Sequence, residues 1–112
     1  MEGEYFTKAD WILFRKMVPK WQEAYMERLL GEYQTLISSD DDPSVRFWAL
    51  NKRLQEDSRR KGVQLDMRRS MLIWNLCALI GEGAITFDDL DGFSEGLSER
   101  VREICIHFNT LE

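Results

Sequence analysis

Apolar residues recur along this chain every three or four positions, which is the spacing of an amphipathic α-helix. No segment alternates apolar and polar residues as a half-buried strand does. Five segments carry the helical spacing, and proline, glycine and capping residues separate them. The pattern predicts an all-α fold, a compact bundle of about five helices in a single domain over residues 1–112, with helices at 8–17, 19–37, 43–61, 66–82 and 87–109.

Two of the predicted helices begin with the residue pattern of an N-terminal cap. Thr7 precedes the first helix and Asp10 follows three positions later, so each side chain can accept a hydrogen bond from the backbone N–H of the other residue. Thr86 and Asp89 repeat this spacing before the last helix. These pairs predict helix starts at residues 8 and 87.

Proline and glycine set the other boundaries. Proline disfavours the helical conformation of the residue before it, so Pro19 is expected to end the first helix and to begin the second. Pro43 is expected to begin the third helix after the polar turn 38–42. Gly62 and Gly83 are expected to adopt the left-handed conformation that closes the third and fourth helices.

The apolar positions also predict which side of each helix is buried. In the second helix they cover an arc of about 180°, which is wider than one neighbour needs, so this helix is expected to contact two others. The predicted core stripe of the third helix consists of Phe47, Leu50 and Leu54. No apolar residue occurs from 55 to 61, so the end of that helix is expected to project past the core. In the last helix a break near Gly92 or Gly96 is left open.

The segment 67–80 is the most apolar part of the chain, and it predicts a helix that other protein must enclose. One side consists of Leu72, Ile73, Leu76, Leu79 and Ile80. The second side consists of Met67, Met71, Trp74 and Ala78. Methionine and tryptophan are frequent in interfaces, so this second side is a candidate partner-binding surface. The alternative is that the first helix covers it through Trp11, Ile12, Leu13 and Phe14.

Charge is distributed unevenly in a chain whose net charge is −5. Residues 46–69 contain 8 basic and 3 acidic side chains, which gives a local balance of +5. A basic cluster that could contact phosphates or an acidic protein consists of Arg59, Arg60, Lys61, Arg68 and Arg69. The alternative is that these cations complement a helix C-terminus and that the segment pairs with the acidic ends of the same chain, residues 1–45 and 70–112. The acidic character of the whole chain argues against a dedicated nucleic-acid binder.

Motifs for catalysis, metals or cofactors are weak. The segment 83–89 resembles the second half of a calcium-binding loop, but Ala78 and Ile80 would then occupy the first two ligand positions and cannot bind calcium. Cys77 and His107 could form a nucleophile–base pair, yet no third group is evident to orient them. We therefore predict that the protein is not an enzyme and uses no metal and no cofactor.

Cysteine usage and hydropathy bear on the compartment. Cys77 and Cys105 both fall on apolar sides of predicted helices, as expected for free thiols in a reducing cytosol. The longest apolar run, 71–80, is about half of the ~20 residues that a membrane span needs, and no secretion leader opens the chain. We expect a cytoplasmic protein without membrane contact.

The segment from Trp21 to Leu30, followed by Glu32 and Tyr33 and later by the segment from Ala84 to Leu90, resembles a group of short uncharacterised helical proteins from Gram-positive bacteria. The shared features are aromatic core positions and a helix cap. The resemblance implies a bacterial source and a soluble helical bundle. It implies no activity, and no functional residue is carried over from it.

Together these patterns predict a small acidic helical module that acts through protein–protein contact, either with another protein or with itself as a homodimer. The predicted contact residues are those of the second side of the segment 67–80. The alternative is a helical regulator that contacts nucleic acid through the basic cluster.

Overall fold

The computed structural model describes residues 5–111, and the side chains of residues 5–108. Four α-helices and two 3-10 helices make up this part of the chain, which contains no strand: α1 (Lys8–Ile37), α2 (Pro43–Asp57), η1 (Arg69–Met71), α3 (Leu72–Gly81), η2 (Phe87–Leu90) and α4 (Glu95–Leu111). The all-helical fold class is confirmed. The predicted number of five α-helices is wrong, because the first two predicted helices form one continuous helix, α1. Other helices are shorter than predicted.

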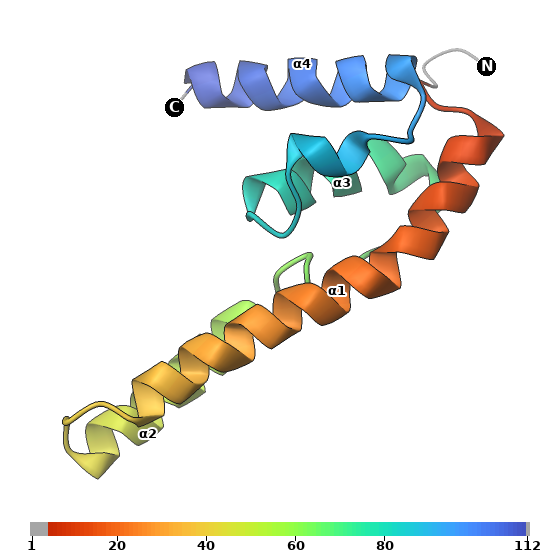
Figure 1. Ribbon diagram of the computed structural model, residues 1–112. Helices are drawn as coiled ribbons and strands as arrows, with labels where there is room; N and C mark the ends of the chain where they lie inside the picture. Colours follow the sequence, from red (N-terminus) through yellow and green to blue (C-terminus); the bar gives the residue numbers. More distant parts are fainter. Residues whose placement is uncertain (1–4, 112) are drawn as a thin grey trace.

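The helices form a helical core with a long hairpin that extends from it (Figure 1). α3 packs on α4, and α2 packs antiparallel along the second half of α1. The first half of α1 lies at the side of α3 and α4, so α1 joins the core to the hairpin. The molecule measures 56 × 32 × 22 Å along its principal axes.

Two apolar clusters share α1 as their common element. The larger cluster is formed by α1, α3, η2 and α4, and its fully buried side chains include Phe14, Leu72, Leu76, Leu79, Leu90, Leu97 and Val101. The smaller cluster lies between α1 and α2 and contains Tyr25, Leu29 and Tyr33, with Leu50 and Val63 packed against them. Buried positions therefore recur every three or four residues along α1, from Phe14 to Tyr33.

The predicted helix break at Pro19 is wrong, because α1 continues from Lys8 to Ile37 with Pro19 inside it. A proline inside a helix costs about 3 kcal/mol. Val18 and Trp21 lie beside it and are buried, and each buried apolar side chain contributes about 1.5–3 kcal/mol. Pro19 itself is exposed, so water can bond the carbonyl that loses its partner. α1 bends within its first half, as expected for an internal proline (Figure 1).

The predicted helix end at Lys61 is also wrong, because α2 ends at Asp57 and the chain then turns back. The backbone N–H groups of Val63 and Gln64 both donate to the Arg60 carbonyl, and this turn brings Val63 into the smaller cluster. Gly62 does not adopt the expected left-handed conformation. Gly83 does, with φ of 77°, as predicted.

The fourth predicted helix begins later than residue 66. The Asp66 carboxylate accepts the Arg68 N–H at 3.2 Å, and this local bond competes with a helical turn. The buried Asn75 side chain donates to the Asp66 carbonyl at 2.8 Å and holds the extended segment against α3. A short 3-10 turn then leads into α3 at Leu72.

The last predicted helix is divided in two. The Thr86 N–H donates to Asp89 at 2.8 Å, which confirms the predicted start, but only the 3-10 helix η2 follows it. The break lies at Gly92, whose φ of 100° is available to glycine and interrupts a helix. α4 then begins at Glu95.

Candidate interaction surfaces

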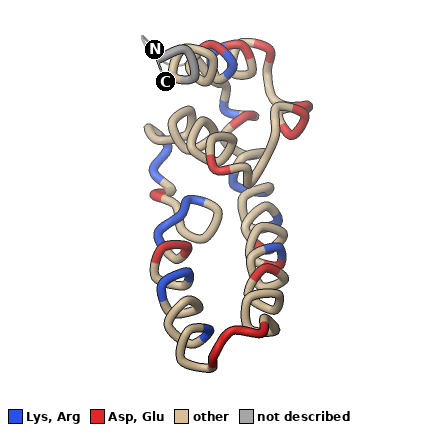
Figure 2. Tube along the Cα trace, turned by 90° about the vertical axis from the view of Figure 1, so that its left-hand side faces the viewer, with Lys and Arg blue, Asp and Glu red and all other residues tan. Residues whose placement is uncertain are grey.

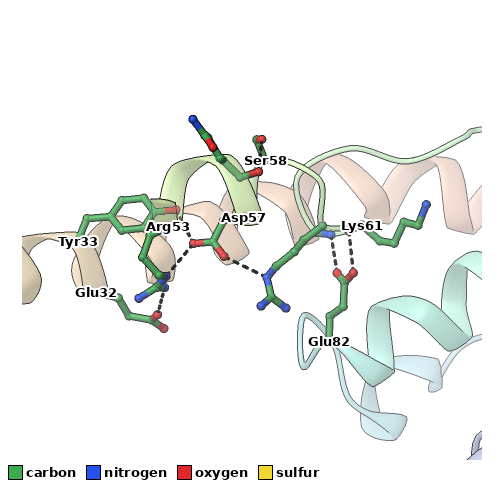
Figure 3. A network of polar contacts seen from close by, with 10 residues as sticks. Glu32, Tyr33, Arg53, Asp57, Ser58, Lys61 and Glu82 are labelled. Carbon is green, nitrogen blue, oxygen red and sulfur yellow. Dashed lines mark hydrogen bonds and ion pairs between the residues drawn. The ribbon is translucent and has the colours of Figure 1, made fainter. Parts of the chain in front are cut away.

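A buried polar network holds the two helices of the hairpin together (Figure 3). The Tyr33 hydroxyl on α1 donates to the Asp57 carboxylate on α2 at 2.7 Å. Arg53 donates to the same carboxylate at 3.3 Å, and Arg60 donates to its other oxygen at 3.0 Å. Arg53 also forms an ion pair with Glu32 of α1 at 2.6 Å. Asp57, which is 3% exposed, is therefore surrounded by donors from both helices.

The ionisation of this network suits a structural role. Burial raises the pKa of Asp57, but the hydrogen bonds from Tyr33 and Arg60 and the charges of Arg53 and Arg60 outweigh burial, so its pKa lies below the usual 3.8. Burial and the bond to Asp57 raise the pKa of Tyr33 to about 12. Asp57 is thus held as an anion whose oxygens already have partners, which leaves it no role as an accessible base. Sequence reasoning missed this residue, because no periodic pattern marks a buried carboxylate.

Two further contacts attach the hairpin to the core. The Glu82 carboxylate at the end of α3 accepts the backbone N–H of Lys61 at 3.0 Å and that of Gly62 at 3.2 Å (Figure 3). Arg28 of α1 donates to the Gly83 carbonyl at 3.0 Å. Gly62 lies directly against the ring of Tyr25, where a Cβ atom would come within 2.3 Å of Cδ2. The hairpin is therefore held at its base by polar bonds and by close packing.

The outer part of the hairpin exposes large apolar side chains. The predicted core stripe of α2 is wrong in two of its three residues: Phe47 is 63% exposed and Leu54 is 47% exposed, while Leu50 is partly buried. The reason is tertiary, because among residues 5–111 α1 is the helix that packs on α2, and no third helix of this part of the chain covers the pair (Figure 1). Trp48 is also 63% exposed, and its ring meets that of Phe47 edge-on at 5.1 Å.

These side chains gather on one side of the hairpin. A hollow of about 210 Å³ lies between α1 and α2, and its lining includes Met26, Leu30, Tyr33, Leu54 and Val63. Residues seven positions apart share a side of a helix, so Ile37 lies on the side of Leu30, and Phe47 lies on the side of Leu54. We call the side formed by Met26, Leu30, Ile37, Phe47 and Leu54 the hairpin face.

The predicted partner-binding residues lie elsewhere, near α3 and α4. Met67 and Trp74 are exposed, Trp74 at 52%, whereas Met71 and Ala78 are partly buried. They do not form one continuous helical side, because Met67 lies in the extended segment before η1. The Trp74 ring packs edge-on against Phe108 of α4 at 6.3 Å. Phe108 is also exposed, and we call the pair Trp74 and Phe108 the α3–α4 patch.

The first helix does not cover Trp74 as the alternative interpretation expected. Phe14 is fully buried in the larger cluster, and Trp11 and Leu13 pack against that cluster. Ile12 points outward and is exposed. Trp74 therefore remains half-covered within this chain, so enclosing it fully requires other protein.

The basic cluster lies along one edge of the molecule, formed by α2 and the segment after it (Figure 2). Several of its cations have a partner in the same chain. Arg60 pairs with Asp57, Arg68 pairs with Asp66, and Arg69 lies over the Phe6 ring at 5.3 Å. The alternative expected pairing with the acidic ends of the chain, but Arg60 and Arg68 pair with carboxylates inside the basic segment 46–69. Arg59 is exposed, and no partner of its side chain lies among residues 5–108.

The two cysteines and the histidine lie on α3 and α4. Cys77 of α3 and Cys105 of α4 are partly buried, and burial and the neighbouring Cys105 raise the pKa of Cys77 to about 12. Burial raises the pKa of Cys105 as well. His107 is exposed and its ring meets Phe108. Within the described chain, no three or more His, Cys, Asp or Glu side chains gather where they could hold a metal ion.

Comparison of this chain with models of protein families, with curated proteins and with solved structures finds no match. Over the described residues, every helix is too short or too polar to cross a membrane. The surfaces described above are therefore interpreted from their own geometry.

Proposed function

We propose that this protein acts by binding protein, and that the hairpin face is its main contact surface. The observation that supports the proposal most strongly is the exposure of Phe47 and Leu54 on a hairpin that the Tyr33–Asp57 network holds in shape. A rigid surface loses little conformational freedom on binding, so more of the contact energy appears as affinity.

The size of the exposed side chains supports the same proposal. A phenylalanine or tryptophan buries about 150–250 Å², at about 25 cal/mol per Å². An aromatic side chain that is 63% exposed, such as Phe47, therefore gains about 3 kcal/mol when a partner covers it fully. Contiguous apolar surface of this kind is uncommon on proteins that bind nothing.

The α3–α4 patch is the second contact surface of the proposal. It includes Trp74, one of the residues predicted from the sequence, and it adds Phe108 of α4. Of the other predicted residues, Met67 is exposed in the segment before η1, and Met71 and Ala78 are partly buried. Tryptophan is among the residue types that dominate binding energy, and aromatic residues in general are enriched in interfaces.

Contact with nucleic acid through the basic cluster has weaker support. Ion pairs with Asp57 and Asp66 reduce the charge that Arg60 and Arg68 offer to phosphates. The combined variant Arg68→Glu, Arg69→Glu tests the alternative. Salt-dependent binding of DNA or RNA by the natural chain, lost in this variant, would favour nucleic acid over protein as the partner.

Site-specific photo-cross-linking tests the proposal itself. A benzophenone amino acid replaces Leu54 or Trp74 in the full chain, and a matched chain carries it at Glu99, an exposed position of α4. We expect protein adducts of defined mass, either with the same chain or with another, from position 54 or 74 and not from position 99. Absence of protein adducts at both apolar positions, in cells that produce the chain naturally, would overturn the proposal.

A further inference from the structure

The hairpin face combines a projecting ring and a hollow at opposite ends of one surface. Phe47 lies one turn from the start of α2, next to the hairpin turn. The hollow lies toward the other end, where Leu54 of α2 and Ser58, just after it, line the hollow with Met26 and Val63. At 1.5 Å per residue, Phe47 and Leu54 are about 10 Å apart along the helix. A copy turned end to end would bring its Phe47 to this hollow.

We propose that the hairpin face binds the hairpin face of a second copy of this chain, with the two hairpins antiparallel. This inference rests on the proposed function and names the partner of the same surface. A two-fold symmetric interface requires one surface to be complementary to itself. A ring at one end of the surface and a hollow at the other satisfy that requirement only when the two hairpins are antiparallel. A parallel arrangement would place the two Phe47 rings against each other.

The hollow has a size that suits an aromatic side chain. An apolar cavity of about 150 Å³ is large enough to hold a benzene molecule. The hollow between α1 and α2 measures about 210 Å³, and its lining is almost entirely apolar apart from Asp57 and Ser58. Two copies would fill two such hollows, one with each Phe47.

The apolar arc of α1 supports the same arrangement. Buried Leu29 and Tyr33 face α2, whereas Leu30, directly beside them, is 55% exposed. The second half of α1 thus carries apolar residues for two neighbours, and in the described part of the chain α2 is the one helix that packs along it. The corresponding helix of a second copy would supply the missing neighbour.

The charges along the hairpin are complementary in the same antiparallel sense. The turn at the tip contains Asp40, Asp41 and Asp42, which form the acidic end in Figure 2. Arg59 and Lys61 follow the base of α2, at the opposite end. Antiparallel pairing brings the acidic tip of each copy to the basic base of the other, whereas parallel pairing would bring the two acidic tips together. The shape of the hairpin face and the charges at its two ends therefore both favour a second copy of the chain in the antiparallel orientation.

Sedimentation of the full chain over a range of concentrations tests the inference. We expect a reversible dimer that Phe47→Ser weakens about 100-fold or more, since the symmetric interface loses two rings at once. Trp48→Ser is the matched control: Trp48 is equally exposed, but it lies 100° farther round α2, away from the side that Phe47 shares with Leu54. The control is expected to change the dissociation constant less than about threefold. Circular dichroism verifies that both variants keep their helices.

A charge exchange tests the orientation. Asp40→Arg and Arg59→Asp each are expected to weaken the dimer, and the two together are expected to restore it, because each substituted residue meets the other across the antiparallel interface. A benzophenone at position 47 is expected to cross-link to a peptide of residues 54–63 in an adduct of twice the chain mass.

The outcomes separate this inference from the proposed function. A chain that stays monomeric at millimolar concentration overturns the second copy as partner. A dimer that is equally sensitive to Phe47→Ser and to Trp48→Ser also overturns the proposed pairing. If in either case the benzophenone at position 54 still yields an adduct with a different protein, the proposed function stands and only the identity of the partner fails.

Discussion

Asp10 and Ser94 are 84 positions apart in the chain, yet the Asp10 carboxylate accepts both the backbone N–H of Ser94 at 2.7 Å and its hydroxyl at 2.6 Å. The same carboxylate accepts the Thr7 N–H at 2.9 Å within the cap of α1. Ser94 in turn accepts the Leu97 N–H in the first turn of α4. One buried carboxylate therefore joins the starts of α1 and α4.

Asp10→Ala is expected to lower the free energy of unfolding by about 2–3 kcal/mol. The substitution removes a helix cap, worth about 1 kcal/mol, and it also leaves the Ser94 donors without an acceptor in a part-buried position. Urea titration followed by circular dichroism measures the change. Asp88→Ala, at an exposed position of η2, is the control and is expected to change stability by less than about 0.5 kcal/mol. Equal effects of the two substitutions would contradict the role given to Asp10.

Stability is expected to fall in acid, beginning near pH 4. The pKa of Asp10 and that of Asp57 both lie below the usual 3.8, because hydrogen bonds and, for Asp57, nearby arginines outweigh the effect of burial. A carboxyl group with a lowered pKa in the folded state contributes stability above its unfolded pKa, and this contribution is lost as the pH falls through the folded value.

Thermal unfolding between pH 2 and pH 7 measures this loss. The variant Asp57→Asn lacks one of the two titrating groups, so its unfolding temperature is expected to vary less with pH below 4 than that of the natural chain. An identical slope for both proteins would show that Asp57 is not coupled to folding as described.

Gly62→Ala is expected to destabilise the protein by about 1–3 kcal/mol, because the added Cβ would lie 2.3 Å from Cδ2 and 2.6 Å from Cγ of Tyr25 and must displace the ring. Gly31→Ala is the matched control. Gly31 lies inside α1 with no atom within 4 Å of the new Cβ, so this variant is expected to gain about 0.5–1 kcal/mol. Chemical denaturation of both variants checks the opposite signs. A neutral Gly62→Ala variant would mean that the Tyr25 contact is looser than described.

Cys77 is expected to react slowly with iodoacetamide at pH 8. Its pKa of about 12 leaves little thiolate, which is the reactive form, compared with a cysteine at the ordinary 9.0. Mass spectrometry of the native chain is expected to show modification of Cys77 at least about 100-fold slower than in the chain unfolded in urea. Rapid modification of native Cys77 at pH 8 would instead indicate that α3 and α4 separate readily.

Local patterns carried enough information to place the caps at Thr7 and Thr86 and the left-handed Gly83, since a cap or a glycine turn depends on residues within a few positions of each other. The apolar side of α3 was predicted for the same reason, because helical spacing identifies Leu72, Leu76 and Leu79. The prediction of a break at Pro19 was wrong because the local cost of the proline is outweighed by the burial of Val18 and Trp21 beside it against distant parts of the chain. The predicted core stripe on α2 was wrong because periodicity shows which residues of a helix are apolar. It does not show whether another helix lies beside them to bury them.

By itself, then, the sequence determined the helical class, the positions of the caps and the apolar character of each helical side, all of which arise from contacts within one or two turns. The tertiary structure alone decided that Asp57 is buried among donors, that Gly62 packs against Tyr25 and that Leu54 lines an open hollow between α1 and α2. These features depend on residues more than twenty positions apart. The spacing of apolar and polar residues along the chain does not show which distant surfaces come into contact.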